Sequence, residues 1–535
     1  MLGDNALPVE IVSPAGGTRS MVAYVEVTSP SGGVRRSEHE LQVPAGRRSR
    51  VALAWRADQP GLHRAAVRLF DVTSGRLVAA RTDVRLPVRP RWTFTQDRSY
   101  YTREEAVRFR ARLHRPGPVP ARLRVELGSP GRAPLGAELG FVQGQAEGSF
   151  PAAGVPQGAH VLRAWLVEGG RAVDSLEVRF TRHPPAAHEV KIDQFTRALL
   201  VQGRPFLPVG LYWVRAEALG SLRRMGFNSG DYLYSLRGEE VASLMDSAAA
   251  AGVGVLLELT HLIRGRQTPD HAAIQTTVER YRRHPALLVW YIVDEPADAA
   301  VPAARLEGIC RRIRELDPYH PVYLVNNRPH TYGEYAAASD IVAVDVYPVP
   351  LQPLTRVQEC VEQARWACLD SKPVWLVAQA FGGVEHWPRP PTPAELRNMV
   401  FQGLVRGARG VLFYRLCGEG ERRIQPMPLW REVQALAGQL SELAPVLLAQ
   451  DEPRCPDVGQ GIEAALWVHR QEHYLLAVNV TPSPRPLRLP LLDLPPMARA
   501  EALTGGPTPR LAAGRLEVEM APLGAHLYRL EPVGL

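Results

Sequence analysis

An apolar stretch that ends in two carboxylates holds the residues best suited to chemistry. Seven apolar or aromatic residues, Leu287 to Val293, are followed directly by Asp294, Glu295 and Pro296. Such a run is typical of a strand buried on both faces. A carboxyl group at the mouth of such a strand is desolvated, which raises its pKa and lets it hold a proton near neutral pH. The stretch therefore predicts a general acid at the end of this strand.

Other polar and aromatic residues also follow apolar runs. Aromatic faces stack on sugar rings, and amides and carboxylates bind hydroxyls, so a carbohydrate is the simplest ligand. The candidate ligand-binding residues are Tyr212, Trp213, Asp231, Tyr232, His261, Asp294, Asn326, Tyr347, Gln379, Phe381, Trp387 and Arg415, and the catalytic candidates are Glu295, Asp345 and Glu258. Each aromatic residue could instead pack in the core, and His261 could be an ordinary loop histidine. The sequence has no glycine-rich phosphate loop at the last strands and no His-x-His pair, so no metal or cofactor is predicted.

The elements that must position these residues alternate regularly. From about residue 206 to 445, apolar runs alternate eight times with amphipathic stretches. This alternation predicts a parallel sheet, and eight repeats in about 240 residues predict a closed (β/α)8 barrel, whose active site lies where the strands end. The predicted helices cover residues 216–225, 239–251, 272–283, 303–316, 333–338, 354–369, 393–406 and 429–443.

The segments on both sides of the barrel predict β-sandwiches. Short alternating strands separated by Gly, Pro and Ser are typical of antiparallel sandwiches. The predicted domains are an immunoglobulin-like sandwich at 1–90, a second one at 91–185, the barrel at 186–445 and a C-terminal sandwich at 446–535. The stretch FTQDRSYYTREEAVRFRARL in the second segment resembles the opening of macroglobulin-type domains, which supports a fold only.

Composition and charge narrow the class of protein. The net charge is +8, but the basic residues, all arginine except Lys191 and Lys372, are scattered among acidic residues. Nucleic-acid binding needs a clustered basic stripe, which is missing. The five cysteines have no Cys-x-x-Cys spacing, which argues against a disulfide framework or a zinc site. No apolar run approaches the roughly 18 residues of a membrane span.

The N-terminal residues do not have the pattern of a signal peptide. A basic segment followed by an apolar core is missing from MLGDNALPVEIVSP. The compartment stays open between the cytoplasm and, if a signal was removed, the periplasm or the outside of the cell. The oligomeric state is not predicted.

The end of the apolar run Leu287–Val293 resembles a known motif. WYIVDEP is similar to the end of strand four in clan A glycoside hydrolases, which usually reads Asn-Glu-Pro. GRPFLPVGLYW at Gly203–Trp213 resembles the first barrel strand of that group, and LLAVNVTPSP with GAHLYRLEP resembles its trailing β-domain. The resemblance covers roughly residues 190–535 and points to the β-galactosidase and mannanase-like members. It implies that Glu295 is the general acid/base and that Asp294 replaces an asparagine that binds a sugar hydroxyl. Alternatively, the Asp-Glu-Pro segment is a polar cap of the next helix.

The second carboxylate departs from the family pattern. The resemblance implies a nucleophilic glutamate at the end of strand seven, where this chain has Gln379. An amide cannot form a glycosyl ester, so either Asp345 is expected to serve as nucleophile or general base, or Glu258 is expected to activate water in an inverting reaction. Each could instead be an ion-pair partner of Arg415 or Arg264. Glu385 and Glu419 are less favoured because they follow strands seven and eight on loops.

The predicted function is hydrolysis of O-glycosidic bonds in a poly- or oligosaccharide. The carboxylate separation would decide between retention, at about 5–5.5 Å, and inversion, at roughly 6.5–9.5 Å. The alternative is a carbohydrate-binding or scaffold protein on a barrel that has lost hydrolysis. A third alternative is adhesion through the N-terminal sandwiches.

Overall fold

The computed structural model describes residues 3–12, 17–44, 46, 48–114, 120–232, 237–384, 386–415, 427–449, 453–492, 494–512 and 514–533. The chain separates into two compact units. One comprises Met1–His183 with Trp366–Asp370, and the other comprises Pro184–Arg365 with Ser371–Leu535. Cys417, Glu385 and Glu419 lie outside the described residues.

The first part of the N-terminal unit consists of two antiparallel sheets. Its strands are β1 (Gly3–Val12), β2 (Arg19–Thr28), β3 (Val34–Val43), β4 (Arg48–Ala57), β5 (Gly61–Asp71) and β6 (Leu77–Val88). One sheet has the order β3-β2-β5-β6, and the other pairs β1 with β4. Alternate residues of β2 and β5 are buried, and both sheets contribute to one hydrophobic core. This is a sandwich-like pair of sheets; its immunoglobulin-like character stays a prediction.

The second part of this unit repeats the arrangement with its own core. Its strands are β7 (Trp92–Gln96), β8 (Ala106–Leu113), β9 (Ala121–Gly128), β10 (Leu135–Gly140), β11 (Gln145–Pro151), β12 (Gly158–Glu168) and β13 (Arg171–Arg182). The sheets have the orders β10-β9-β12-β13 and β11-β8-β7. Phe109 from one sheet and Leu162 from the other lie in the same core. The antiparallel sheets predicted before the barrel are therefore present.

The second unit contains a closed eight-stranded barrel, as predicted. Its strands are β17 (Val209–Val214), β18 (Ser229–Tyr232), β19 (Gly254–Glu258), β20 (Leu287–Asp294), β21 (Val322–Asn326), β22 (Ile341–Val346), β23 (Val374–Gln379) and β24 (Val411–Tyr414). All neighbours pair in parallel, and β24 pairs with β17 to close the barrel. The side chains from Leu287 to Val293 are all buried, because one face of β20 points into the barrel and the other lies under the helices.

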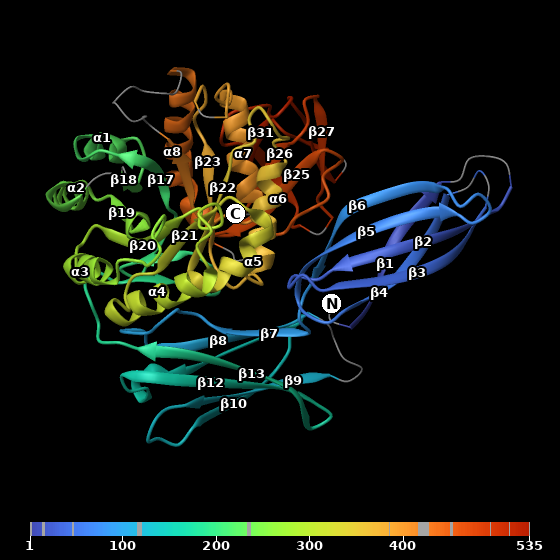
Figure 1. The fold of residues 1–535 in the computed structure, drawn as a ribbon. Helices are drawn as coiled ribbons and strands as arrows, with labels where there is room; N and C mark the ends of the chain where they lie inside the picture. The colour runs from blue at the N-terminus through green and yellow to red at the C-terminus, as the bar shows by residue number, and fades with distance from the viewer. Residues whose placement is uncertain are drawn as a thin grey trace. The chain divides into compact units, whose positions relative to one another are not determined.

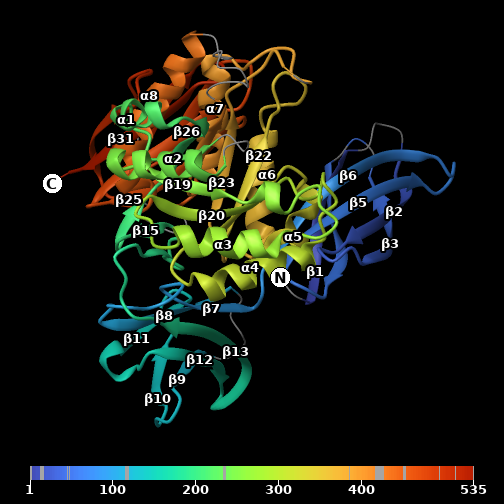
Figure 2. The ribbon, with the colours of Figure 1, turned by 60° about the vertical axis from the view of Figure 1, so that its left-hand side comes forward.

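A helix follows each barrel strand, and these helices surround the strands in Figures 1 and 2. They are α1 (Leu219–Arg224), α2 (Gly238–Ala251), α3 (His271–Tyr281), α4 (Ala303–Leu316), α5 (Tyr332–Tyr335), α6 (Arg356–Ala367), α7 (Pro393–Val405) and α8 (Met427–Leu447). Helix α7 starts at a capping box in which Thr392 accepts a hydrogen bond from the Glu395 N–H. The helix-cap alternative for Asp294–Pro296 is wrong, since α4 begins only at Ala303.

Antiparallel sheets precede and follow the barrel in this unit. The small sheet β14-β15-β16 leads into the barrel, and two sheets with the orders β25-β26-β31-β28 and β27-β30-β29 follow it around one shared core. Their strands are β14 (Val190–Ile192), β15 (Leu199–Val201), β16 (Arg204–Phe206), β25 (Ile462–His469), β26 (Glu472–Asn479), β27 (Arg485–Pro490), β28 (Met497–Ala502), β29 (Arg510–Ala512), β30 (Arg515–Met520) and β31 (Ala525–Pro532). The domain boundaries at residues 90, 185 and 445 remain predictions.

A buried amide joins helix α7 to the C-terminal sheets. The Nδ2 atom of Asn398 donates to the carbonyl oxygens of Asn479, at 2.9 Å, and of Leu523, at 3.0 Å. Its Oδ1 atom accepts from Gln402 at 2.6 Å. The side chains of Asn398 and Gln402 are fully buried. The two carbonyl oxygens and the Gln402 amide would all lose a partner if this side chain were removed.

We predict that Asn398→Ala destabilises this unit. The change removes the Asn398 donor from one buried and one partly buried carbonyl oxygen, which costs about 2–4 kcal/mol. Urea unfolding followed by tryptophan fluorescence measures the loss. Glu442→Ala on the exposed face of α8 is the control, with an expected change within about 0.5 kcal/mol. Equal stability of the two variants would contradict the role given to Asn398.

Candidate active site

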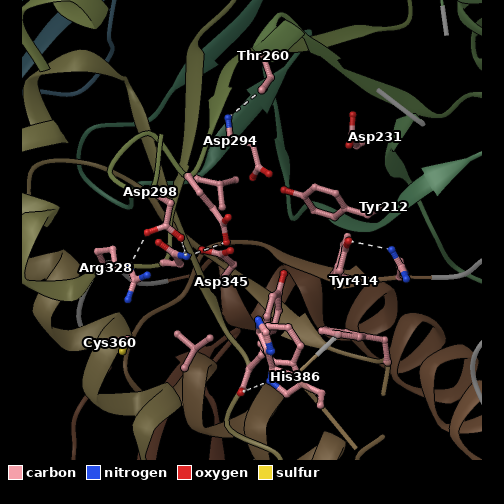
Figure 3. Close-up of a pocket in the computed structure, with 18 of the residues that line it drawn as sticks. Tyr212, Asp231, Thr260, Asp294, Asp298, Arg328, Asp345, Cys360, His386 and Tyr414 are labelled. Atoms are coloured by element: carbon pink, nitrogen blue, oxygen red, sulfur yellow. Dashed lines mark hydrogen bonds and ion pairs between the residues drawn. The ribbon is translucent and has the colours of Figure 1, made fainter. Parts of the chain in front are cut away.

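A cavity of about 1240 Å³ opens at the carboxyl ends of the barrel strands. Figure 3 shows Asp298 and Arg328 on one side of it and Tyr212 and Tyr414 on the other, with Asp294 and Asp345 facing the space between. Of the residues proposed from the sequence, those that line the cavity are Tyr212, Trp213, Asp231, Glu258, Asp294, Glu295, Asp345, Tyr347, Phe381, Trp387 and Arg415. Their common position follows from the parallel strands, which all end at one face.

Four proposed residues lie outside the cavity wall. The Tyr232 hydroxyl is buried and donates to the Glu258 carbonyl oxygen at 3.1 Å. His261 is half-buried in a short 3₁₀ helix, where burial lowers the pKa of its imidazole to about 4. Asn326 is fully buried, and its Nδ2 atom donates to the Thr331 hydroxyl at 3.0 Å. Gln379, also fully buried, bonds to the main chain of Val349.

Several residues of the wall were not selected from the sequence. They include Thr260, Arg264, Tyr291, Asn327, Asp298, Arg328 and Tyr414. Asn327, one residue beyond the selected Asn326, donates through Nδ2 to Glu295 Oε1 at 2.9 Å and to Asp298 Oδ2 at 2.8 Å. The two asparagines follow the same strand, and sequence alone does not show which one faces the cavity.

The two carboxyl groups of Glu295 and Asp345 contact each other. Their side chains hydrogen-bond, and the side chain of Glu295 is 24% exposed whereas Asp345 is 5% exposed. Burial, together with the neighbouring charge of Glu295, holds the pKa of Asp345 well above its usual range. Two carboxylates in contact cannot both ionise at low cost, so the pair keeps one proton near neutral pH.

A second group of carboxyls lies on strands two to four. Burial and the charge of Asp294 raise the pKa of Glu258 to about 8. Burial and the charge of Glu295 raise the pKa of Asp294 to about 6, although the Tyr291 hydroxyl donates to its Oδ1 atom at 2.6 Å. Burial and the charge of Glu258 also raise the pKa of Asp231. Near pH 7, Asp294 is therefore the ionised member of this group.

Two neighbours hold Asp294 in place. The Thr260 Oγ1 atom accepts a hydrogen bond from the Asp294 N–H at 3.0 Å and also hydrogen-bonds the Glu258 carboxyl group. The Arg264 Nη1 atom lies 3.7 Å from Asp294 Oδ2 and 4.0 Å from Glu295 Oε2. Arg264 thus lies beside both adjacent carboxylates, and among the described residues its ion pairs are with these two and not with Glu258.

The backbone adopts rare conformations at two residues of the wall. Trp213 has φ 60° and Glu295 has φ 44°, both in the left-handed region that side chains with a Cβ disfavour. Strand β17 also has a register irregularity between Leu211 and Val214. Such conformations persist only where surrounding contacts enforce them, and they are frequent at functional sites. Here they turn an indole and a carboxyl group toward the same cavity.

Aromatic rings form the wall beside strands six to eight and strand one. Tyr347 stacks on Tyr414 with ring centroids 5.7 Å apart, and Phe381 contacts Tyr347 and Trp387 at 5.1 Å each. The Trp387 indole N–H donates to the Tyr347 carbonyl oxygen at 2.9 Å. The wall is therefore rigid, with aromatic faces suited to apolar faces of a sugar ring.

Gln379 anchors the loop that follows strand six. Its Oε1 atom accepts from the Val349 N–H at 2.9 Å, and its Nε2 atom donates to the Val349 carbonyl oxygen at 2.8 Å. This pair of hydrogen bonds needs one donor and one acceptor on the side chain. An amide has both, whereas a carboxylate can only accept. The strand-seven residue thus holds the Val349 segment, which lies just beyond Tyr347.

Two further features concern the described part of the chain as a whole. No group of three or more His, Cys, Asp or Glu residues there is arranged to hold a metal ion. None of the described helices has the length and apolar character needed to cross a membrane.

Comparisons of the sequence find distant relatives. No protein-family model matches the chain. The β-glucuronidase of Mus musculus is 30% identical over 138 residues, which are 24% of this chain and 20% of that protein. The β-glucuronidase of Chlorocebus aethiops is 26% identical over 143 residues, which are 26% of this chain and 20% of that protein. The chain thus spans about a fifth of the length of these curated relatives.

Comparison with solved structures finds weak overall similarity, with TM-scores below 0.5. A cyclomaltodextrinase has a TM-score of 0.47 and 11% identity, covering 81% of this chain and 98% of its own. A putative glycoside hydrolase from Bacteroides vulgatus has a TM-score of 0.46 and 12% identity, covering 83% and 98%. A putative α-galactosidase from Bacteroides fragilis has a TM-score of 0.45 and 11% identity, covering 83% and 95%. Similarity this distant does not identify the substrate of this chain.

We predict that Gln379→Glu destabilises the protein without raising activity. A carboxylate cannot donate to the Val349 carbonyl oxygen, so the loss is about 1–3 kcal/mol. Because a buried acid has a raised folded-state pKa, its protonated form is favoured and the loss grows as pH rises above about 4.3. Urea unfolding at pH 5 and pH 8 measures this. Gln352→Glu, the same change at an exposed residue, is the control. A stable Gln379→Glu protein with faster turnover would refute the anchoring role.

We also predict a pH-dependent effect of Glu258→Gln. The folded-state pKa of Glu258 is about 8 against an ordinary value of 4.5, so the native state binds more protons between these pH values. Its contribution to the free energy of unfolding therefore falls as pH rises through this window. Glu258→Gln does not lose stability in this way as pH rises. Its free energy of unfolding relative to that of the wild type should therefore rise by at least about 1 kcal/mol from pH 5 to pH 8. If the unfolding free energies of the wild type and of Glu258→Gln changed with pH in the same way, Glu258 would have no raised pKa and the prediction would be wrong.

Proposed function

We propose that this protein is a glycoside hydrolase that cleaves O-glycosidic bonds of a poly- or oligosaccharide in the barrel cavity. The observation that carries the proposal is the contact of Glu295 with Asp345 inside a cavity walled by aromatic rings. The contact keeps a carboxylic acid proton available near neutral pH, and the rings offer faces for sugars. Glycosidic cleavage requires this proton, because the leaving oxygen is a poor leaving group unless it is protonated.

Glu295 is the proposed proton donor and Asp345 the proposed partner that shares its proton. Glu295 has the greater exposure to the cavity, so a glycosidic oxygen can reach it. Its orientation is fixed by the Asn327 amide and by Arg264. Donation of the one proton that the pair holds leaves both carboxyl groups ionised, and the pair regains a proton from the water molecule that completes the hydrolysis. The sequence predicts Asp345 as a nucleophile or general base. We propose instead that Asp345 shares the proton that Glu295 donates.

Asp294 and Glu258 are the proposed second pair of carboxyl groups. Asp294 is ionised near pH 7, and its Oδ1 atom is held by the Tyr291 hydroxyl. An ionised carboxylate can attack the sugar carbon or activate a water molecule, giving retention or inversion respectively. Glu258 is linked to Asp294 through Thr260 and keeps its own proton. Proton NMR of the first sugar anomer released separates the two outcomes.

A second candidate function is carbohydrate binding without hydrolysis. It is favoured by one observation: Gln379 occupies the strand-seven position at which the resemblance implies a nucleophile, and this amide is committed to Val349. The aromatic wall would serve a binding protein equally well. Turnover is therefore the property that distinguishes the two candidates.

The test is hydrolysis of a panel of aryl glycosides and oligosaccharides by the wild type, Glu295→Gln and Asp345→Asn. Loss of a general acid should lower kcat about 10²–10⁴-fold on substrates with poor leaving groups. Dinitrophenyl glycosides need little protonation and should be affected far less. Calorimetric titration with the same sugars checks that binding persists. Glu279→Gln, exposed on α3, is the control. Binding without turnover of any substrate by the wild type would refute the hydrolase.

A further inference from the structure

We infer that the cavity accepts a sugar that carries a carboxylate, a uronic acid unit, and that Arg415 binds this carboxylate. The inference rests on the proposed function in one respect, namely that the cavity binds carbohydrate. It adds the class of sugar and the residue that selects it.

Most of the positive charge in the wall is matched by carboxylates of the chain. Four of the described arginines line the cavity, and three of these four have a carboxylate oxygen within 4.0 Å. These pairs are Arg264 with Asp294, Arg328 with Asp298, and Arg356 with Glu359. Among the described residues, no carboxylate pairs with Arg415 in this way. One buried positive charge is thus left for a ligand.

Arg415 is held by aromatic rings rather than by an anion. Its residue exposure is 8%, and its guanidinium carbon lies 4.4 Å from the centre of the Trp213 ring and 5.4 Å from that of Tyr414. The Nη1 atom donates to the Tyr414 hydroxyl at 3.2 Å. The buried Nε atom has no hydrogen-bond acceptor. A buried donor without an acceptor is costly, and an anion beside the guanidinium group would compensate part of this cost.

The guanidinium group of Arg415 suits a carboxylate. Two of its N–H groups can bind the two oxygens of a carboxylate in a bidentate manner. A sugar hydroxyl offers only one oxygen and no charge. The cation over Trp213 and the fixed Tyr414 contact hold the fork in one orientation, so little conformational entropy is lost on binding.

The position of Arg415 also suits a charged sugar. Arg415 follows β24, which lies opposite β20 in the closed barrel, whereas Asp294 and Glu295 stand at the end of β20. A uronic acid can therefore place its carboxylate at Arg415 while its glycosidic oxygen faces Glu295. This arrangement keeps the negative group of the substrate away from the ionised carboxylates of the chain.

The test compares paired 4-methylumbelliferyl glycosides of the same anomer that differ only at C6, as glucuronide with glucoside and galacturonide with galactoside. We expect a higher kcat/KM for the uronide in at least one pair. Arg415→Gln should lower kcat/KM for that uronide roughly tenfold to hundredfold and lower kcat/KM for the neutral glycoside by a clearly smaller factor. Arg415→Lys keeps the positive charge but not the planar guanidinium group, so its kcat/KM for the uronide should lie between those of the wild type and Arg415→Gln.

Arg356→Gln is the matched control, because Arg356 lines the same cavity but is paired with Glu359. It should affect uronide and neutral glycoside alike. A wild type that prefers the neutral member of every pair, or an Arg415→Gln variant that loses both members equally, would overturn the inference while leaving a hydrolase. Preference for a 6-sulfated glycoside over the uronide would overturn the carboxylate assignment.

Calorimetry separates this inference from the proposed hydrolysis. The wild type and Arg415→Gln are titrated with glucuronate, galacturonate, glucose and galactose. Uronate binding by the wild type that is lost in Arg415→Gln supports the inference even if no glycoside is cleaved. Equal binding of uronates and neutral sugars, or uronate binding that survives in the variant, overturns it.

Discussion

The desolvation of carboxyl groups at the mouth of a closed barrel is the constraint on which the site depends. Asp231, Glu258 and Asp345 are almost entirely buried, and Asp294 and Glu295 stand next to them. Ionised carboxylates at this density would repel one another in a poorly solvated space. Protonation of Asp345 and Glu258 reduces this repulsion, and donors from tyrosine, threonine and asparagine side chains stabilise the charges that remain. Proton storage near neutral pH is therefore a consequence of how the barrel packs.

The surrounding structure must be stiff to keep like charges together. The left-handed backbone at Trp213 and Glu295 is held by the strands that end there. Gln379 fixes Val349 through two main-chain hydrogen bonds, and the rings of Tyr347, Phe381 and Trp387 pack against one another just beyond it. A strand-seven amide in place of an acid is consistent with this supporting role. It removes one more charge from a site that already holds many.

The arginines divide the cavity into two electrostatic regions. Arg264 and Arg328 neutralise the carboxylates that follow strand four, and Arg415 stands on the opposite wall among aromatic rings. A guanidinium on an indole face is stabilised by the ring quadrupole without losing its capacity to bind an anion. The acidic half of the cavity suits bond cleavage, whereas the aromatic and cationic half suits recognition. Both halves arise from one ring of strand ends.

Hydrophobic periodicity, read from the sequence alone, determined the barrel. Continuous apolar runs such as Leu287–Val293 and the amphipathic stretches between them are local patterns, and the helices fall within a few residues of their predicted bounds, as α4 does at Ala303–Leu316. The same pattern placed Glu295, Asp345 and Glu258 at strand ends. It did not show that Asn327 rather than Asn326 faces the cavity, that Tyr232 and Gln379 turn into the protein, or that Glu295 contacts Asp345. These outcomes depend on strand tilt, backbone turns and barrel closure, which bring together residues far apart in sequence and which no local pattern encodes.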